Sequence, residues 1–318
     1  MRSFLTTRTA IWGISLLALA GCEPALAPTV KPKPRPAQLQ GPSNAYKPPS
    51  PVSLDLARYY QGVQTNLLTR GLLRTDGGGP DTPYDADDLA RNFETIAFYN
   101  EYPGQAVSSS GRRTSRQLSR WSVPVRIQPE FGPSVAPNVR QQEAARIDSY
   151  ASRLSRLTDH PISTVSRNAN FHVFVAGEDD TAYVQARLRQ LIPGIGQAQL
   201  DLFDELPRSF YCFVFASASN GAPQTYTRAV ALIRAEHPDL VRLSCIHEEI
   251  AQGLGLPNDS PSARPSIFND DDEFALLTSH DEKLLTILYD PRLKAGMTAD
   301  EARPVVRIIA RELMGQPL

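Results

Sequence analysis

The chain is poor in cysteine and histidine, the residues that carry much of the metal and nucleophile chemistry of proteins. Its 318 residues include three cysteines and five histidines. Cys212 and Cys245 lack the close spacing of a zinc site, and no cysteine stands in a catalytic signature. The sequence also has no G-x-S-x-G elbow and no S-x-x-K motif, so it gives no sign of a serine hydrolase.

An excess of charge of one sign is missing as well. The formal net charge is −1, which gives no indication that the chain binds nucleic acid. The basic residues from Arg112 to Arg120 lack interleaved aromatics and are typical of a solvated loop. The glycines at 77–79 do not form a phosphate-binding loop, because no strand leads into them and no lysine follows.

Long apolar runs are absent except near the N-terminus. Arg2 and Arg8 precede an apolar stretch at 10–20 that is too short to span a bilayer. It ends in Leu-Ala-Gly-Cys at Cys22, which resembles the lipobox of a bacterial lipoprotein. The resemblance implies that Cys22 is acylated and holds the mature chain on the periplasmic face of a membrane, and Glu23 in place of the usual Asp retention signal favours the outer membrane. The alternative is a chance cysteine after a secretory signal.

Proline dominates the segment that follows. Eight prolines lie between residues 28 and 51, among Lys, Ala and polar residues. Such a segment cannot bury enough apolar surface to fold and stays extended. The sequence therefore predicts a signal peptide at 1–21, a tether at 22–53 and a single folded domain at 54–318.

Export also bears on the two remaining cysteines. An oxidising compartment favours a disulfide between Cys212 and Cys245, which would tie a strand to a helix. The alternative is a pair of buried free thiols.

Helical spacing of apolar residues predicts several helices. Asn138 is expected to cap a long helix, and Asp239 a helix that ends in a glycine turn. Asp281 is expected to cap a later helix, and Thr298 with Glu301 forms a capping box for the last one. The other predicted helices cover residues 54–73, 86–99 and 181–191.

Alternating apolar residues, rich in aromatic and β-branched types, predict strands at 121–127, 170–176, 209–216 and 227–233. Pro124 indicates an edge position for the first of these strands. Together the patterns predict an α+β fold with a mixed sheet and a long backing helix.

The most distinctive motif is the sequence His-Glu-Glu-Ile-Ala-Gln-Gly-Leu-Gly-Leu-Pro-Asn-Asp at 247–259. In zinc metalloproteases, H-E-x-x-H-x-x-G-x-x-H places metal ligands and a general base on one helical face. Counting from Glu248 reproduces that spacing, with Glu249 as the base. Glu248, Gln252 and Asn258 then stand at the ligand positions. The segment resembles the active-site helix of a zincin without its histidines, which implies a zincin-like fold in which residues 239–255 form the motif helix.

A different frame, with His247 as the first ligand, fails for two reasons. Its second ligand would be Ala251, which has no donor atom. Helical geometry also puts His247 in an apolar stripe that runs from Leu240 to Leu254. We therefore expect His247 to be a packed, hydrogen-bonded core residue, with the motif's carboxylates on the other side.

Several segments resemble one bacterial family, catalogued as domain of unknown function 2927. They are residues 248–260, 267–268 and 288–293, together with 73–75 and 92–102. The resemblance covers most of the folded part. Because the family carries no established activity, it implies an architecture and a compartment, not a reaction.

Three hypotheses of function remain open. The first is a degenerate metallopeptidase-like fold used for binding or scaffolding, since Glu, Gln and Asn do not hold zinc tightly. The second is an atypical hydrolase of envelope peptides or polymers, with Glu249 as general base. It would act without a metal or with one hard divalent ion on Glu248, Gln252, Asn258 and Asp259. The third is an interaction module for envelope assembly, with an envelope protein or peptidoglycan as partner.

Overall fold

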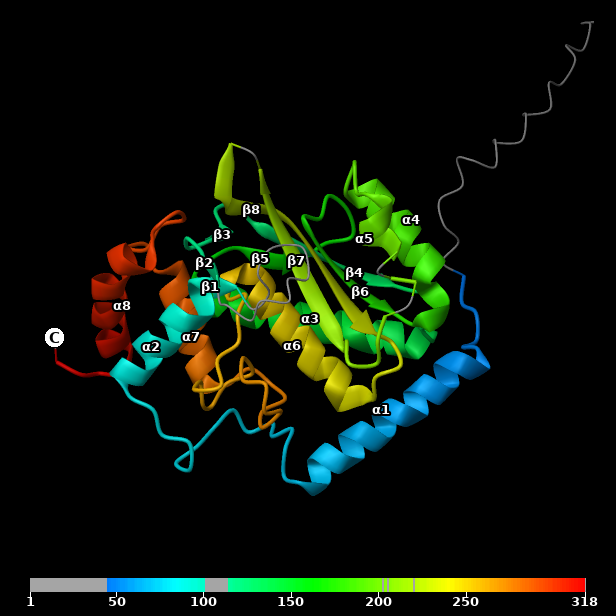
Figure 1. Cartoon of the computed structure of the whole chain (residues 1–318), viewed down its shortest axis with the longest axis horizontal. Coiled ribbons are helices and arrows are strands. Elements are labelled where there is room, and N and C mark those ends of the chain that lie inside the picture. The colour runs from blue at the N-terminus through cyan, green and yellow to red at the C-terminus, as the bar shows by residue number, and fades with distance from the viewer. Residues whose placement is uncertain (1–44, 101–113, 202, 205, 220, 318) are drawn as a thin grey trace, which may run out of the picture. The chain divides into compact units, whose positions relative to one another are not determined.

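A six-stranded sheet lies at the centre of the protein, with helices on both faces (Figure 1). The computed structural model describes residues 45–100, 114–201, 203–204, 206–219 and 221–317. The predicted signal peptide, Cys22 and residues up to 44 of the predicted tether lie outside these residues. Within the described part, no helix combines the length and the apolar character needed to cross a bilayer.

The sheet is mixed, as the sequence predicts. β4 lies between β5 and β6, and β6 pairs in parallel with β8. β3 pairs in parallel with the start of β8, and β7 runs antiparallel along it. The strands are β3 (Arg120–Trp121), β4 (Val125–Phe131), β5 (Ile162–Thr164), β6 (Phe171–Ala176), β7 (Cys212–Ser219) and β8 (Ala222–Arg234); β1 (Tyr99–Asn100) and β2 (Thr114–Ser115) form a separate pair.

Helices cover the two faces of the sheet unequally. Alternate residues of β6 point to opposite faces of the sheet. Val173 belongs to the larger core on one face, and Phe174 to the smaller core beneath α4 and α5 on the other. The larger core contains α3 and α6, with α2, α7 and α8 packed further out. The helices are α1 (Pro51–Thr69), α2 (Ala86–Ala97), α3 (Pro137–Thr158), α4 (Thr181–Leu191), α5 (Gln197–Asp201), α6 (Asp239–Gly255), α7 (Ser279–Tyr289) and α8 (Ala299–Leu313), with a 3₁₀ turn η2 at Glu178–Asp180.

Proline explains three differences between the predicted and observed helix starts. α1 begins at Pro51, inside the predicted tether, because Ser50 caps the helix and proline suits its first turn. Pro137 likewise opens α3, so Asn138 lies within the helix and does not cap it. α6 begins at Asp239, and the capping position belongs to Pro238.

Two other predictions about local structure are corrected. The strand predicted at 121–127 is divided in two. Trp121 belongs to β3, which lies at the end of the strand order, whereas residues 125–127 belong to β4, which pairs on both sides and is not an edge strand. Pro124 precedes β4 and therefore withholds no donor from its ladder. Asp281 is the third residue of a capping box in which Thr278 is the cap of α7. The capping box at Thr298 and Glu301 is confirmed.

The disulfide between Cys212 and Cys245 is confirmed and joins β7 to α6. It closes a loop with a sequence separation of 33 residues. In the chain-entropy account, a crosslink of this kind removes disordered conformations from the unfolded chain. β7 and α6 are therefore held together covalently as well as by packing.

We predict that the variant Cys212→Ala/Cys245→Ala loses about 3 to 4 kcal/mol of unfolding free energy. The measurement is urea unfolding of the exported protein, followed by circular dichroism. Adding a reductant should lower the midpoint for the wild type and leave that of the double variant unchanged. Equal midpoints for the two oxidised proteins would contradict a stabilising bridge.

Candidate functional site

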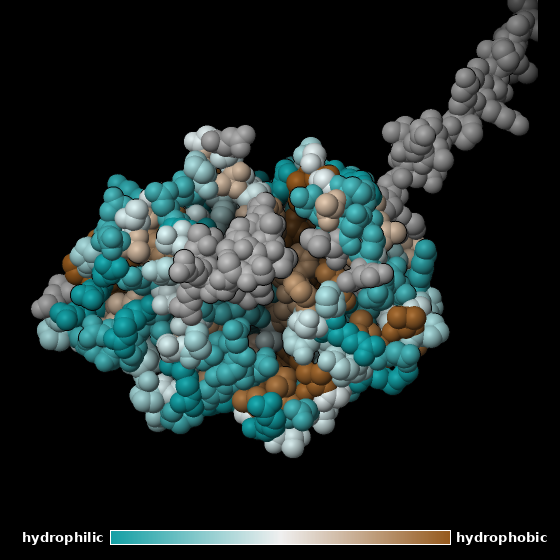
Figure 2. All heavy atoms as spheres, viewed as in Figure 1, coloured by the Kyte–Doolittle hydropathy of each residue, from teal (hydrophilic) through white to brown (hydrophobic). Residues whose placement is uncertain are grey.

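A cleft of about 890 Å³ runs along α6 and β7. One wall is α1, which contributes Tyr60, Val63 and Leu67. The others are the segments at 201–214 and 257–274. Figure 2 shows a hollow with apolar side chains near the middle of the face on which Figure 1 shows β7 and α6.

Two kinds of side chain dominate the lining of the cleft. The carboxylates are Asp201, Glu248, Glu249, Asp259, Asp270 and Asp272. The aromatic residues are Tyr60, Phe203, Phe210, Tyr211, Phe213 and Phe274. Among the described residues that line the cleft there is no Lys, Arg or His.

The helix α6 forms the floor of the cleft, and near its C-terminal end its backbone comes very close to the sheet. A Cβ atom on Gly253 would lie 2.5 Å from the Phe171 ring, so only glycine permits this approach. Gly255 has a φ of 135°, which disfavours any larger residue. The indole of Trp121 donates to the carbonyl oxygen of Gly253 at 2.9 Å, which satisfies one of the carbonyl groups left open at the helix end.

The N-terminal end of α6 is fixed by charged groups shared with α3. Arg242, which is buried, donates from Nε to Oε1 of the fully buried Glu143 at 2.8 Å and from Nη1 to the His237 carbonyl oxygen at 2.6 Å. Arg146 of α3 forms a two-bond pair with Asp239 at 2.8 and 2.7 Å. Hydrogen bonds from Arg146 lower the pKa of the Asp239 carboxyl. The motif helix is thus anchored at both ends.

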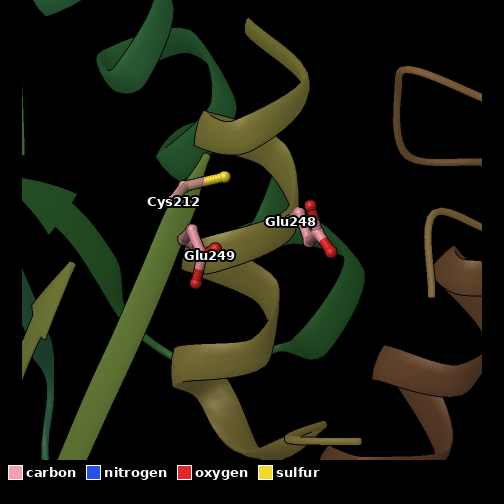
Figure 3. A group of neighbouring side chains, drawn as sticks. All are labelled: Cys212, Glu248 and Glu249. Atoms are coloured by element: carbon pink, nitrogen blue, oxygen red, sulfur yellow. The ribbon is translucent and has the colours of Figure 1, made fainter. Parts of the chain in front are cut away.

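Glu248 and Glu249 extend from the middle of α6 in different directions, beside Cys212 of β7 (Figure 3). One ligand atom from each of these three residues lies within 4.8 Å of the others. Glu249 is only 3% exposed, whereas Glu248 is half-buried. Because the Cys212 sulfur is bonded to Cys245, only the two carboxylates of this group remain as metal ligands.

The other residues of the predicted ligand set differ in whether they line the cleft. Gln252 and Asp259 both line the cleft, and Nε2 of Gln252 donates to Oδ1 of Asp259 at 3.4 Å. Asn258 is buried, and its Nδ2 donates to the Thr95 carbonyl oxygen at 2.9 Å. Its side chain is therefore used to attach the loop after α6 to α2.

None of the five histidines of the chain, all of which lie in the described ranges, lines the cleft. Each makes a hydrogen bond elsewhere. Their partners are Val123 for His160, Glu130 for His172, Tyr211 for His237, Leu277 for His247 and Asn92 for His280. The described residues that line the cleft thus offer carboxylate and amide oxygens and no imidazole.

His247 is the packed core residue that its helical position predicts. Its ring stacks on Tyr150 of α3 at 4.0 Å between centroids, and Nδ1 accepts from the Leu277 amide. Burial, followed by the charges of Arg153 and Arg146, lowers the pKa of His247 to about 3. The imidazole is neutral at physiological pH and connects α6 to α3 and the segment before α7.

The wall at 206–211 was not predicted as part of a site, although its aromatic residues are visible in the sequence. The guanidinium of Arg234, at the end of β8, donates to the carbonyl oxygens of Leu206, Pro207 and Phe210. Tyr60 of α1 donates to the Arg208 carbonyl oxygen at 3.0 Å. The structure also places Asp270 and Asp272, from the acidic run at 270–273, on the cleft.

A search of curated proteins and a search of solved structures find no match to this chain. A scan of protein families matches residues 86–308 to the family described as "Protein of unknown function (DUF2927)". The matched span contains the motif helix, β7 and all six carboxylates of the cleft. The helix α1, which supplies one wall, precedes it. The chain therefore belongs to the DUF2927 family.

Proposed function

We propose that this protein is a zincin-like domain that binds polypeptide in its cleft and does not hydrolyse it with zinc. The observation that carries the proposal is a large cleft beside the motif helix that none of the five histidines lines. The element order supports the zincin-like part: β4, the long helix α3, four further strands of which β7 is antiparallel to its neighbour, then α6 ending in glycine.

The donor atoms beside the motif helix do not fit a catalytic zinc. Such zinc is held by imidazoles with at most one carboxylate, or by thiolates. Here Glu248 and Glu249 offer two carboxylates, Gln252 offers an amide and Cys212 is oxidised. We therefore assign no zinc chemistry to this cleft.

The ligand is proposed to be a polypeptide because an edge strand borders the cleft. Among the described strands, β7 pairs with β8 alone, which leaves its other edge open. Cys212, Phe213 and Val214 all line the cleft, although successive residues of a strand point to opposite faces. The cleft therefore runs along the edge, where the backbone groups of an extended peptide can pair.

A second candidate function is hydrolysis with Glu249 as a metal-free general base. Its support is the position of Glu249, which is buried, next to Glu248 and on the lining of the cleft. A carboxylate in such a place could activate water against an envelope peptide or polymer.

Sequence features support a place in the cell envelope. The lipobox-like Leu-Ala-Gly-Cys at Cys22 and the proline-rich segment after it suit a domain tethered to a membrane by acyl chains. We propose the outer membrane, facing the periplasm, which would give the cleft access to envelope proteins and to peptidoglycan peptides.

The first prediction concerns metal. Oxidised protein, loaded with zinc and then dialysed, should retain no stoichiometric zinc, because the cleft lacks imidazoles. Elemental analysis of wild type and of Glu248→Ala/Gln252→Ala should agree. About one equivalent of zinc or calcium in the wild type, lost from the variant, would instead establish a metal site on α6.

The second prediction separates binding from hydrolysis. Wild type and Glu249→Gln should leave quenched fluorescent peptides and peptidoglycan stem peptides equally intact, at the rate seen in buffer. The alternative function requires cleavage by the wild type that falls by about 10²- to 10⁴-fold in Glu249→Gln. Glu248→Gln is the matched control, since it removes a neighbouring carboxylate.

The third prediction concerns the anchor. Wild-type protein should sediment with membranes and be released by detergent, whereas Cys22→Ala should appear in the periplasmic soluble fraction, because acyl chains supply the membrane affinity. Labelling with a palmitate analogue should mark only the wild type. Membrane association of unlabelled Cys22→Ala would rule out the lipid anchor.

A further inference from the structure

Negative charge is concentrated in the cleft of a protein that is nearly neutral as a whole. Six carboxylates line it, yet the formal net charge of all 318 residues is −1. No cationic side chain stands among the described residues that line it. Of the six, Asp201, Asp270 and Asp272 take part in none of the salt bridges between described residues. These charges favour a positively charged ligand.

The exposed carboxylates Asp201, Asp270 and Asp272 form the mouth of the cleft, and the charges near Asp272 affect one another. The Asp272 side chain reaches solvent, yet partial desolvation raises the pKa of its carboxyl above the ordinary value. The charges of Asp271 and Asp270 raise this pKa further. A ligand cation at this point would relieve the repulsion.

Aromatic side chains share the cleft with the carboxylates. Phe203 and Phe213 pack against each other with ring centroids 5.7 Å apart, on the side of β7 that carries α4 and α5. Phe210 at the rim is 44% exposed. A ligand that fits therefore has apolar side chains as well as positive charge.

Two groups of residues that line the cleft lie on opposite sides of β7. Cys212 and Val214 face α6, which carries Glu248 and Glu249, as the disulfide to Cys245 and the packing near Gly253 establish. Phe213, between them, faces Phe203. A peptide paired with the open edge of β7 would send alternate side chains to these same two sides.

We propose that the cleft binds an extended polypeptide in which Lys or Arg residues alternate with apolar residues. The basic side chains point to the carboxylates of α6 and to Asp270 and Asp272, and the apolar ones to Phe203 and Phe213. The inference rests on the proposed function, because it needs a polypeptide in the cleft, and adds the charge and the alternation of that polypeptide.

The test uses three nine-residue fluorescent peptides with blocked ends and the mature, oxidised protein. One alternates Lys and Val, one alternates Glu and Val, and one has the Lys and Val residues in separate blocks. Fluorescence anisotropy should give saturable binding of the alternating Lys/Val peptide, weakened by added salt. The blocked peptide should bind more weakly, and the Glu/Val peptide should not bind.

Two variants locate the binding. Asp201→Asn/Asp270→Asn/Asp272→Asn removes three exposed charges at the mouth and should weaken the Lys/Val peptide by about tenfold. Asn tolerates the positive φ of residue 272. The matched control, Asp55→Asn/Asp87→Asn/Asp300→Asn, changes the net charge equally at exposed sites outside the cleft lining and should bind as the wild type does. Glu248→Gln tests whether a carboxylate of α6, on the floor of the cleft, contributes to binding of the Lys/Val peptide.

Each other outcome overturns part of the proposal. Equal binding of the Lys/Val and Glu/Val peptides, unaffected by the mouth variant, would remove the charge preference and leave the peptide-binding function intact. Equal binding of the alternating and blocked Lys/Val peptides would remove pairing along β7. Binding of spermidine but of no peptide would assign the cleft to a small cation, and no binding at all would overturn the proposed function as well.

Discussion

The close contact between α6 and the central sheet at Gly253 is the constraint on which the cleft depends. The helix backbone lies so near the Phe171 ring that a single added carbon would collide with it. This approach brings Glu248 and Glu249 beside β7 and places Cys245 within bonding range of Cys212. With the floor fixed by packing and by a covalent bond, the edge of β7 has a defined position relative to the carboxylates of α6.

The walls of the cleft are attached to this floor and to each other. The Val241 amide of α6 donates to Oε1 of Gln64 in α1 at 3.2 Å. α1 is held by the Ser53 hydroxyl, which donates to the buried Glu236 at 2.7 Å, and by the Tyr60 hydroxyl on the opposite wall. Burial raises the pKa of the Glu236 carboxyl. In the segment at 206–210, the Arg234 guanidinium donates to the carbonyl oxygens of Leu206, Pro207 and Phe210, and the Tyr60 hydroxyl donates to that of Arg208. The walls are therefore held by hydrogen bonds between elements far apart in the sequence.

The chemistry of the cleft follows from the residues at the positions where the motif predicts metal ligands. The spacing from Glu248 matches that of the zinc-protease motif, but the side chains at these positions supply a carboxylate and amides. Asn258 ties the loop after α6 to α2. A fold can keep its helix, its glycines and its cleft while the chemistry of its site changes. Packing constrains the helix and the glycines, whereas only the ligand constrains the polar side chains of the site.

The sequence alone determined those features that depend on local pattern. Spacing and alternation located α4 to the residue and gave the α+β class, and the position of His247 in an apolar stripe predicted its burial. Two cysteines in a chain that was expected to be exported predicted their bond. Only the tertiary structure decided that Asn258 turns away from the cleft and that Asp270 lines it. It also brought Tyr60 to Arg208, 148 residues along the chain. The physical reason is that local periodicity fixes which face a residue occupies on its own element, whereas the position of one element against another depends on long-range packing.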